Sequence, residues 1–178
     1  MEKNSGSKQV RRIATIGPES TGKTTLCMEL AGHYRAIWVP EYARTFMENL
    51  KRSYTYEDVI HCAREQMKAE DELLSKADRF LFCDTELINY KVWFNDKFEK
   101  IPDWIEHQIK NRKYDLYLLT SPDLPWVYEA VRENPERREY LFELYKNELE
   151  KRNFIYGTVS GSGATRLETA IKIIDSIF

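Results

Sequence analysis

The sequence is poor in glycine, proline and cysteine, and it has no long apolar run. Seven glycines and six prolines in 178 residues are too scattered to form a flexible linker, so we expect a single domain. No apolar stretch approaches the roughly 20 residues of a membrane-spanning helix, and no membrane partner is expected. Cys27, Cys62 and Cys83 lack the C-x-x-C spacing of zinc and redox sites, which predicts free thiols in a cytoplasmic protein.

The charge is nearly balanced, and the first residues are polar. A formal net charge of −2 gives no electrostatic reason to expect nucleic acid as a partner. The amino-terminal stretch lacks the apolar core of a secretory signal. We therefore expect a frayed tail over residues 1–10 and one domain over residues 11–178. The sequence does not indicate an oligomeric state.

Residues 17–24 read Gly-Pro-Glu-Ser-Thr-Gly-Lys-Thr and match the P-loop pattern G-x-x-x-x-G-K-[ST], with an apolar strand candidate before them and a helix candidate after them. In such a loop the backbone N–H groups and the helix N-terminus bind phosphate oxygens. The lysine reaches the β- and γ-phosphates of ATP, and the last hydroxyl binds Mg²⁺. The predicted nucleotide-binding residues are Gly17, Glu19, Ser20, Thr21, Gly22, Lys23, Thr24 and Thr25, with Thr24 also predicted as a metal ligand.

Short apolar blocks alternate with helical segments along the whole chain. This pattern predicts an α/β fold with three layers, in which a five-stranded parallel sheet is flanked by helices. Strands are expected at 13–16, 36–39, 80–83, 114–119 and 154–159. Helices are expected at 24–31, 56–77, 86–111 with a break at Pro102, 125–133, 135–152 and 165–178. In such sheets ligands bind beyond the carboxyl ends of the strands, so the residues that follow each strand are the candidates for a site.

Polar residues follow the second and third strands. Glu41, Tyr42 and Arg44 come after the second strand, where they could bind and activate a hydroxyl group. Alternatively, Glu41 and Arg44 form only a surface helical pair. Asp84 follows four apolar residues of the third strand, which is the Walker B arrangement and predicts a carboxylate on the Mg²⁺ side. Asp84 is also a rival to Glu41 as the catalytic base.

Arginines and a small-residue loop follow the fourth and fifth strands. Arg132 and Arg138 are predicted on a helical lid, where they would stabilise charge on the transferred phosphate, whereas Arg137 is expected to lie outside the site. The alternative is a solvated charged helix. The loop over residues 160–166 could contact a purine or be an ordinary turn. Among the aromatic residues, most of which are expected in the core, Trp93 is a candidate to stack on a substrate ring.

Five motifs occur in order along the chain: the P-loop, Pro40-Glu41-Tyr42-Ala43-Arg44, Asp84-Thr85-Glu86, Pro122-Asp123-Leu124-Pro125-Trp126 and Arg132-x-x-Pro135-x-x-Arg138-x-x-x-Phe142. Together they resemble the ribosylnicotinamide kinase domain of the NadR-type family, which is grouped with AAA-like P-loop ATPases. The resemblance extends from about residue 11 to residue 174. It departs from the family at residues 128–130, where Tyr-Glu-Ala replaces the Pro-Asp-Gly that the family often has.

This resemblance implies transfer of the γ-phosphate of ATP to the 5′-hydroxyl of a nucleoside, with nicotinamide riboside as the acceptor and Mg²⁺ as the metal. It implies catalytic roles for Lys23, Glu41, Asp84, Arg132 and Arg138, and acceptor binding by Glu41 and Arg44. A kinase for a different nucleoside and a regulatory or switch ATPase are the alternatives. A GTPase switch is excluded because the chain has neither Asn-Lys-x-Asp nor Thr-Lys-x-Asp, and no Asp-x-x-Gly.

Overall fold

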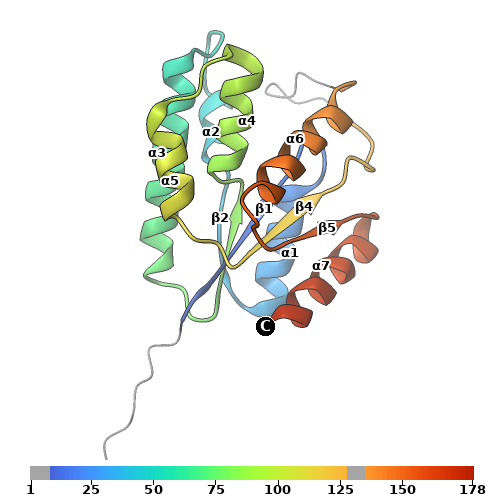
Figure 1. Ribbon diagram of the computed structural model, residues 1–178. Helices are drawn as coiled ribbons and strands as arrows, with labels where there is room; N and C mark the ends of the chain where they lie inside the picture. The colour runs from blue at the N-terminus through green and yellow to red at the C-terminus, as the bar shows by residue number, and fades with distance from the viewer. Residues whose placement is uncertain (1–8, 128–134) are drawn as a thin grey trace, which may run out of the picture.

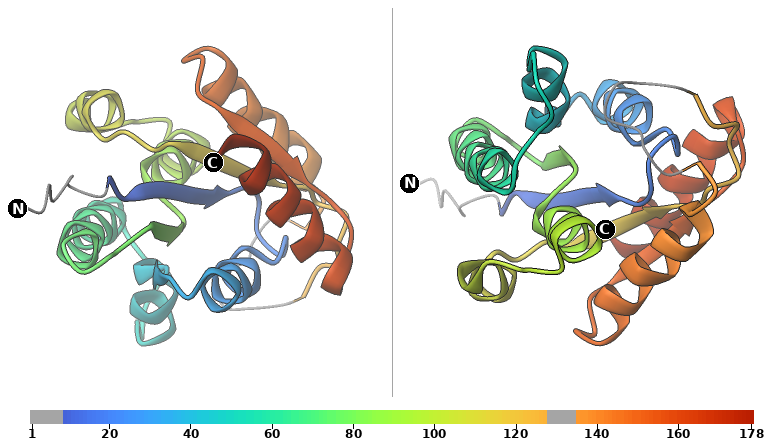
Figure 2. Two further views of the ribbon diagram at one scale, coloured as in Figure 1. Left: turned by 90° about the horizontal axis from the view of Figure 1, so that it is seen from below. Right: turned by 90° about the horizontal axis from the view of Figure 1, so that it is seen from above.

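The computed structural model describes residues 9–127 and 135–178, and these residues form one parallel sheet with helices on both faces (Figures 1 and 2). The strand order is β2-β3-β1-β4-β5, and all four pairings are parallel. The strands are β1 (Arg11–Ile16), β2 (Ile37–Val39), β3 (Phe80–Asp84), β4 (Leu116–Thr120) and β5 (Tyr156–Val159). The prediction of a five-stranded parallel α/β fold is confirmed.

Seven helices connect and cover the strands in the described part of the chain. They are α1 (Lys23–Tyr34), α2 (Tyr42–Glu48), α3 (Tyr56–Leu74), α4 (Leu87–Phe98), α5 (Asp103–Asn111), α6 (Arg138–Glu150) and α7 (Gly163–Ile177). The predicted break at Pro102 separates α4 from α5, since Pro102 is the N-cap residue of α5. Thr55 caps α3 as expected, in a capping box with Asp58.

Two local predictions differ from the structure. The sequence analysis assigned no helix to residues 42–48, where the structure has α2, because seven residues are too few to show a clear helical period. It also placed a helix over residues 125–133. Residues 125–127 are not helical, and the rest of that range lies outside the described residues. Pro125 starts no helix here, because the two residues after it form hydrogen bonds with the P-loop instead. The Trp126 indole N–H donates to Glu19, and the Val127 backbone N–H donates to the Ser20 hydroxyl.

Successive residues of the central strands face opposite layers of the core. Leu116 and Leu118 pack in the layer of α1 and α7, whereas Tyr117 and Leu119 pack in the layer that contains α3 to α6. Side chains of a strand alternate between the two faces of a sheet, so one apolar block supplies both layers. This double burial explains why the strand sequences are continuously apolar. The parallel pairing of β1 with β3 and with β4 places the carboxyl ends of these three strands next to one another.

Candidate functional site

The P-loop follows β1 and is packed tightly against the end of β4. Gly17 has a φ of 143°, and a Cβ atom there would lie 2.4 Å from the hydroxyl of Thr120 and 2.9 Å from its carbonyl oxygen. Only glycine fits this close approach. The Thr21 hydroxyl contacts the Thr120 hydroxyl at 2.7 Å and donates to the carbonyl of Pro18 at 2.8 Å. The loop is therefore held in one shape by buried contacts to β4.

The helix that follows the loop begins without a side-chain cap. Gly22 is the N-cap residue of α1 and has no side chain to bond the first N–H groups of the helix. These N–H groups and the positive end of the helix dipole together form a site for an anion. The Lys23 ammonium lies over the loop and donates to the carbonyls of Gly17 and Pro18 at 3.0 and 2.7 Å. The loop, the helix end and Lys23 are thus arranged as a phosphate site.

Asp84 lies at the end of β3, directly behind the first turn of α1. Its Oδ2 accepts a hydrogen bond from the Thr24 hydroxyl at 2.5 Å, and its carboxyl is completely buried. Burial, with the nearby charge of Glu41 as a second cause, raises the pKa of Asp84 to about 7. Because β1 and β3 are neighbours with Thr15 opposite Asp84, the sheet itself brings this acid to the P-loop.

Thr24 and Asp84 fit a Mg²⁺ ion. The second carboxyl oxygen of Asp84, Oδ1, is buried and has no hydrogen-bond partner within the described ranges. A carboxylate and a hydroxyl are the hard oxygen ligands that Mg²⁺ takes from a protein, usually with substrate phosphates and water for the rest. No group of three or more metal-binding side chains is present in the described part of the chain. A sparse oxygen site of this kind suits a nucleotide-bound metal.

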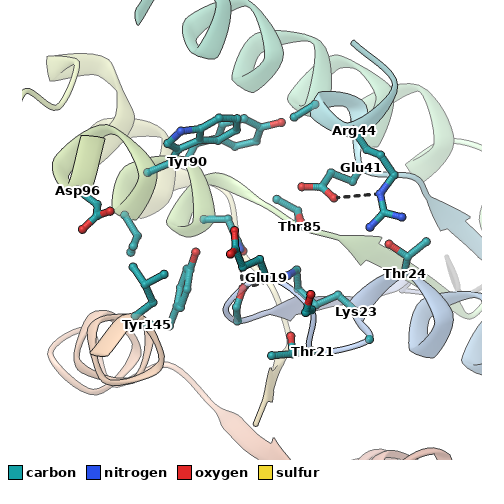
Figure 3. Close-up of a pocket in the computed structure, with 18 of the residues that line it drawn as sticks. Glu19, Thr21, Lys23, Thr24, Glu41, Arg44, Thr85, Tyr90, Asp96 and Tyr145 are labelled. Carbon is teal, nitrogen blue, oxygen red and sulfur yellow. Dashed lines mark hydrogen bonds and ion pairs between the residues drawn. The ribbon is translucent and has the colours of Figure 1, made fainter. Parts of the chain in front are cut away.

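A cavity of about 280 Å³ opens beside the P-loop (Figure 3). All eight predicted nucleotide-binding residues between Gly17 and Thr25 line it. The opposite wall comes from α2, α4 and α6. The residues that line it outside the P-loop are Glu41, Ala43, Arg44, Tyr54, Thr85, Asn89, Tyr90, Val92, Trp93, Asp96, Lys97, Leu141 and Tyr145.

Glu41 and Arg44 satisfy both interpretations of their spacing. They form an ion pair at 3.8 Å, Nε to Oε2, as a helical pair would, and both also line the cavity. Gln66 of α3 holds the start of their helix, because its Oε1 accepts from the Tyr42 N–H at 2.8 Å and its amide donates to the Pro40 carbonyl at 3.3 Å. Gln66 is fully buried. No sequence signal identifies this residue, because it looks like any polar residue on a helix.

The two predicted aromatic residues have different environments. Trp93 lines the cavity and stacks near Tyr90 on α4, with ring centroids 6.2 Å apart. Tyr42 is not among the residues that line the cavity. Its ring packs on Phe46 and its hydroxyl contacts His61 at 3.1 Å. The reason is the helical geometry of α2, which turns residue 42 towards α3 while residues 41 and 44 face the cavity.

The predicted lid is partly described. Arg132 lies outside the described residues. Arg138 begins α6, and its guanidinium donates to the carbonyls of Ser20 and Leu124 at 3.3 and 2.8 Å. It therefore contacts the P-loop backbone, although it does not line the cavity. Arg137 instead makes a bidentate ion pair with Asp96 of α4.

A second arginine, which the sequence analysis did not single out, joins three loops at the carboxyl edge of the sheet. Arg166 of α7 donates to the carbonyls of Thr21, Ser121 and Gly161 at 2.8, 2.8 and 2.5 Å. It also pairs with Asp123 at 2.8 Å, and Asp123 accepts from the Gly161 N–H. The loops after β4 and β5 are thus fastened to the P-loop through one buried cation.

The sheet order and the P-loop define a protein of the P-loop NTPase fold. Residues 12–166 match the family described as AAA domain, and the chain belongs to that family. The resemblance to NadR-type proteins that the motifs predicted is also confirmed. The chain is 27% identical over 128 residues to the trifunctional NAD biosynthesis/regulator protein NadR of Salmonella typhimurium, and 27% identical over 139 residues to that of Escherichia coli.

These matches cover 69% and 74% of this chain but 31% and 34% of the relatives. The chain therefore spans about a third of the length of the curated relatives it matches. Among solved structures, NadR in complex with NAD and AMP-PNP has a TM-score of 0.80 at 22% identity, over 94% of this chain and 49% of that one. Deoxyadenosine kinase from M. mycoides has a TM-score of 0.60 at 16% identity, over 94% and 100%. At these identities the structures show a shared fold.

Proposed function

We propose that the protein is an ATP-dependent kinase that phosphorylates the 5′-hydroxyl of a nucleoside, with nicotinamide riboside as the leading acceptor. The observation that carries this proposal is that one cavity joins the phosphate site at Lys23 to the Glu41–Arg44 pair and to the aromatic wall of α4. A switch ATPase would have no use for an acceptor cavity of this kind. The NadR structures in complex with NAD and AMP-PNP, and with NR, support the same substrate class.

In the proposed reaction the 5′-hydroxyl oxygen of the acceptor bonds to the γ-phosphorus of ATP, and the bond from that phosphorus to the β,γ-bridging oxygen breaks. ADP leaves, and the hydroxyl proton passes to Glu41. Glu41 is better placed than Asp84 for this role, because it lines the cavity while Asp84 is bonded to Thr24. Thr24 and Asp84 would hold Mg²⁺, which neutralises phosphate charge when bound.

The other predicted residues have supporting roles in the proposal. Lys23 and the P-loop bind the phosphates of ATP, and Arg132 and Arg138 belong to the lid. Arg44 holds the acceptor's sugar or a phosphate. Trp93 covers the base, and a cationic ring such as that of nicotinamide riboside gains a cation–π contribution of about 0.5–2 kcal/mol there. That is a preference over neutral nucleosides and not an absolute filter.

The location and the partners are part of the same proposal. Cys27, Cys62 and Cys83 are all free and buried, as a cytoplasmic protein allows. No helix within the described ranges is long and apolar enough to cross a membrane. We propose a cytoplasmic location, with ATP and a nucleoside as small-molecule partners.

The test is to incubate the purified protein with Mg-ATP and a panel of nucleosides that includes nicotinamide riboside, and to read product masses. We expect a nucleoside monophosphate and ADP in equal amounts. Phosphorylation of other nucleosides without turnover of nicotinamide riboside would refute the acceptor and keep the kinase. ADP formation that no acceptor stimulates would favour the ATPase alternative. Unchanged kcat in Glu41→Gln would remove Glu41 as the base.

A further inference from the structure

Two polar side chains in the cavity each have a buried atom with no hydrogen-bond partner in the described part of the chain. Thr85 is 3% exposed and Asn89 is 8% exposed, and both line the cavity. Neither the Thr85 hydroxyl nor the Asn89 Oδ1 has a hydrogen-bond partner among residues 9–127 and 135–178. Buried polar atoms are nearly always hydrogen-bonded in native proteins, so these two need an explanation.

The backbone of Thr85 is held in an unfavourable conformation. Its φ is 75°, a region that β-branched residues rarely adopt. The Thr85 N–H donates to the Thr15 carbonyl at 3.1 Å, which fixes the turn between β3 and α4. Strain of this kind persists where the surrounding structure enforces it, often at ligand sites. Figure 3 shows the Thr85 side chain in the middle of the cavity, beneath Glu41.

The amide of Asn89 is oriented by the P-loop. Its Nδ2 donates to the Gly17 carbonyl at 3.3 Å, so Oδ1 is on the other side of the amide plane. Thr85 directly precedes Glu86, the N-cap residue of α4, whereas Asn89 lies in the first turn of that helix and Trp93 one turn further along it. The cavity wall thus runs from the phosphate end at Gly17, past Thr85 and Asn89, to the aromatic ring of Trp93.

The chemistry of these atoms specifies the ligand group. A threonine hydroxyl both donates and accepts, whereas the Asn89 Oδ1 only accepts, so the ligand must bring at least one donor. The segment between a phosphate site and an aromatic wall is where the sugar of a nucleoside would lie. Resting on the proposed function, we infer that Thr85 and Asn89 bind hydroxyl groups of the acceptor's sugar and make this a site for ribosides in preference to deoxyribosides.

The test crosses protein variants with acceptor analogues. Thr85→Val keeps the volume and the β-branch and removes only the hydroxyl. We expect the acceptor KM of Thr85→Val to rise about tenfold or more for nicotinamide riboside, with the KM for ATP and the Mg²⁺ requirement unchanged. Thr85→Ser should restore most of the loss. Thr15→Val is the matched control, because Thr15 is equally buried but its hydroxyl is bonded to Cys27.

The 2′-deoxy and 3′-deoxy analogues identify the contact. For the analogue that lacks the hydroxyl bound by Thr85, wild type and Thr85→Val should have the same KM. For Asn89→Ala the comparison is between two acceptors. In wild type the analogue that lacks the hydroxyl bound by Asn89 should have a higher KM than the riboside, and in Asn89→Ala the two KM values should be nearly equal. Because both KM values are then measured in one variant, any damage to the P-loop from losing the Gly17 contact affects both and cancels.

Three results would overturn the inference. Equal losses on the riboside and on both deoxy analogues would make the two residues structural. A change in Mg²⁺ requirement with an unchanged acceptor KM would assign Thr85 to the metal side. If wild type phosphorylates no acceptor, the proposed function fails, and calorimetric binding of the same nucleosides to wild type and Thr85→Val still tests the inference. Absence of any binding would refute both.

Discussion

Lys23 lies over the P-loop, and its ammonium makes no contribution to the apolar core. The ammonium donates hydrogen bonds to two carbonyls of the loop itself. Lys23→Ala should therefore leave the far-ultraviolet circular dichroism spectrum and the thermal midpoint close to those of wild type. We expect kcat to fall on the order of 10³-fold, because a cation on the transferred phosphate is lost. Lys68→Ala, an exposed lysine on α3, is the matched control, and near-wild-type turnover of Lys23→Ala would contradict the P-loop assignment.

Asp58 couples the stability of the protein to pH. The Arg52 guanidinium donates two hydrogen bonds to its carboxylate, and this interaction, aided by the Thr55 N–H, lowers the pKa of Asp58 below its ordinary value. A depressed carboxyl pKa stabilises the folded state above the unfolded pKa of about 4, and that contribution is lost as pH falls through the folded pKa.

The corresponding prediction is that Asp58→Asn is less stable than wild type in urea at pH 7, and that the difference shrinks as the pH is lowered below about 4. Glu57→Gln, in the same first turn of α3 but exposed, should show a much smaller difference at pH 7. A gap between wild type and Asp58→Asn that stays constant from pH 7 to pH 3 would show that the carboxylate charge is not the cause.

At the scale of elements, the amino-terminal end of α6 is attached to the P-loop. Arg138 donates to the carbonyls of Ser20 and Leu124, and the Ser20 hydroxyl accepts from the Val127 N–H at 3.1 Å. Trp126 also donates to Glu19 at 3.1 Å. Glu19 and Ser20 of the P-loop therefore contact both residues 126–127 and the first residue of α6. We therefore expect the position of the amino-terminal end of α6 and the shape of the phosphate site to be linked through these contacts.

Arg138→Ala should lower kcat more than it raises the KM for ATP, because charge on the transferred phosphate develops mainly in the transition state. Arg138→Lys keeps the charge and should recover part of the rate, although it loses the two-carbonyl geometry. Lys146→Ala, on the exposed side of the same helix, is the control. Steady-state kinetics with varied ATP would contradict a lid role if kcat stayed at the wild-type value.

At the scale of the whole molecule, a buried charge network around Glu70 and the candidate site lie at opposite ends of the parallel strands. Glu70 of α3 is 1% exposed and bonds Arg12, Arg112 and Tyr114, which come at or just before the amino ends of β1 and β4. The Tyr114 hydroxyl donates at 2.6 Å, and an Arg112 guanidinium nitrogen lies 3.2 Å away. This network joins α3 to the sheet far from the carboxyl edge.

Glu70→Gln should accordingly destabilise the fold by about 3 kcal/mol, because two arginines lose a buried counter-charge. The KM values for ATP and the acceptor should not change in the folded variant. Glu72→Gln, exposed on the same helix, should be nearly neutral. Urea unfolding and steady-state kinetics on one preparation separate the two effects, and a raised KM in Glu70→Gln would show that the edges are coupled.

The sequence by itself determined the fold class and the phosphate site. Five apolar blocks and the P-loop are contiguous segments, so their periodicity and residue types carry the information locally. The placement of Asp84 beside the P-loop also followed, because a parallel sheet gathers the carboxyl ends of its strands at one edge. The strand order β2-β3-β1-β4-β5 depends on which strands pair, and that pairing has no local signal.

Only the tertiary structure decided how the cavity is built. Gln66, Arg166 and Asn89 act through contacts with residues as far as 145 positions away in the chain, and each looks ordinary in its own segment. Tyr42 shows the converse, since a promising aromatic faces α3 once α2 forms. A helix presents residues to one face or another according to its rotation against its neighbours, and that rotation is set by packing across the whole core.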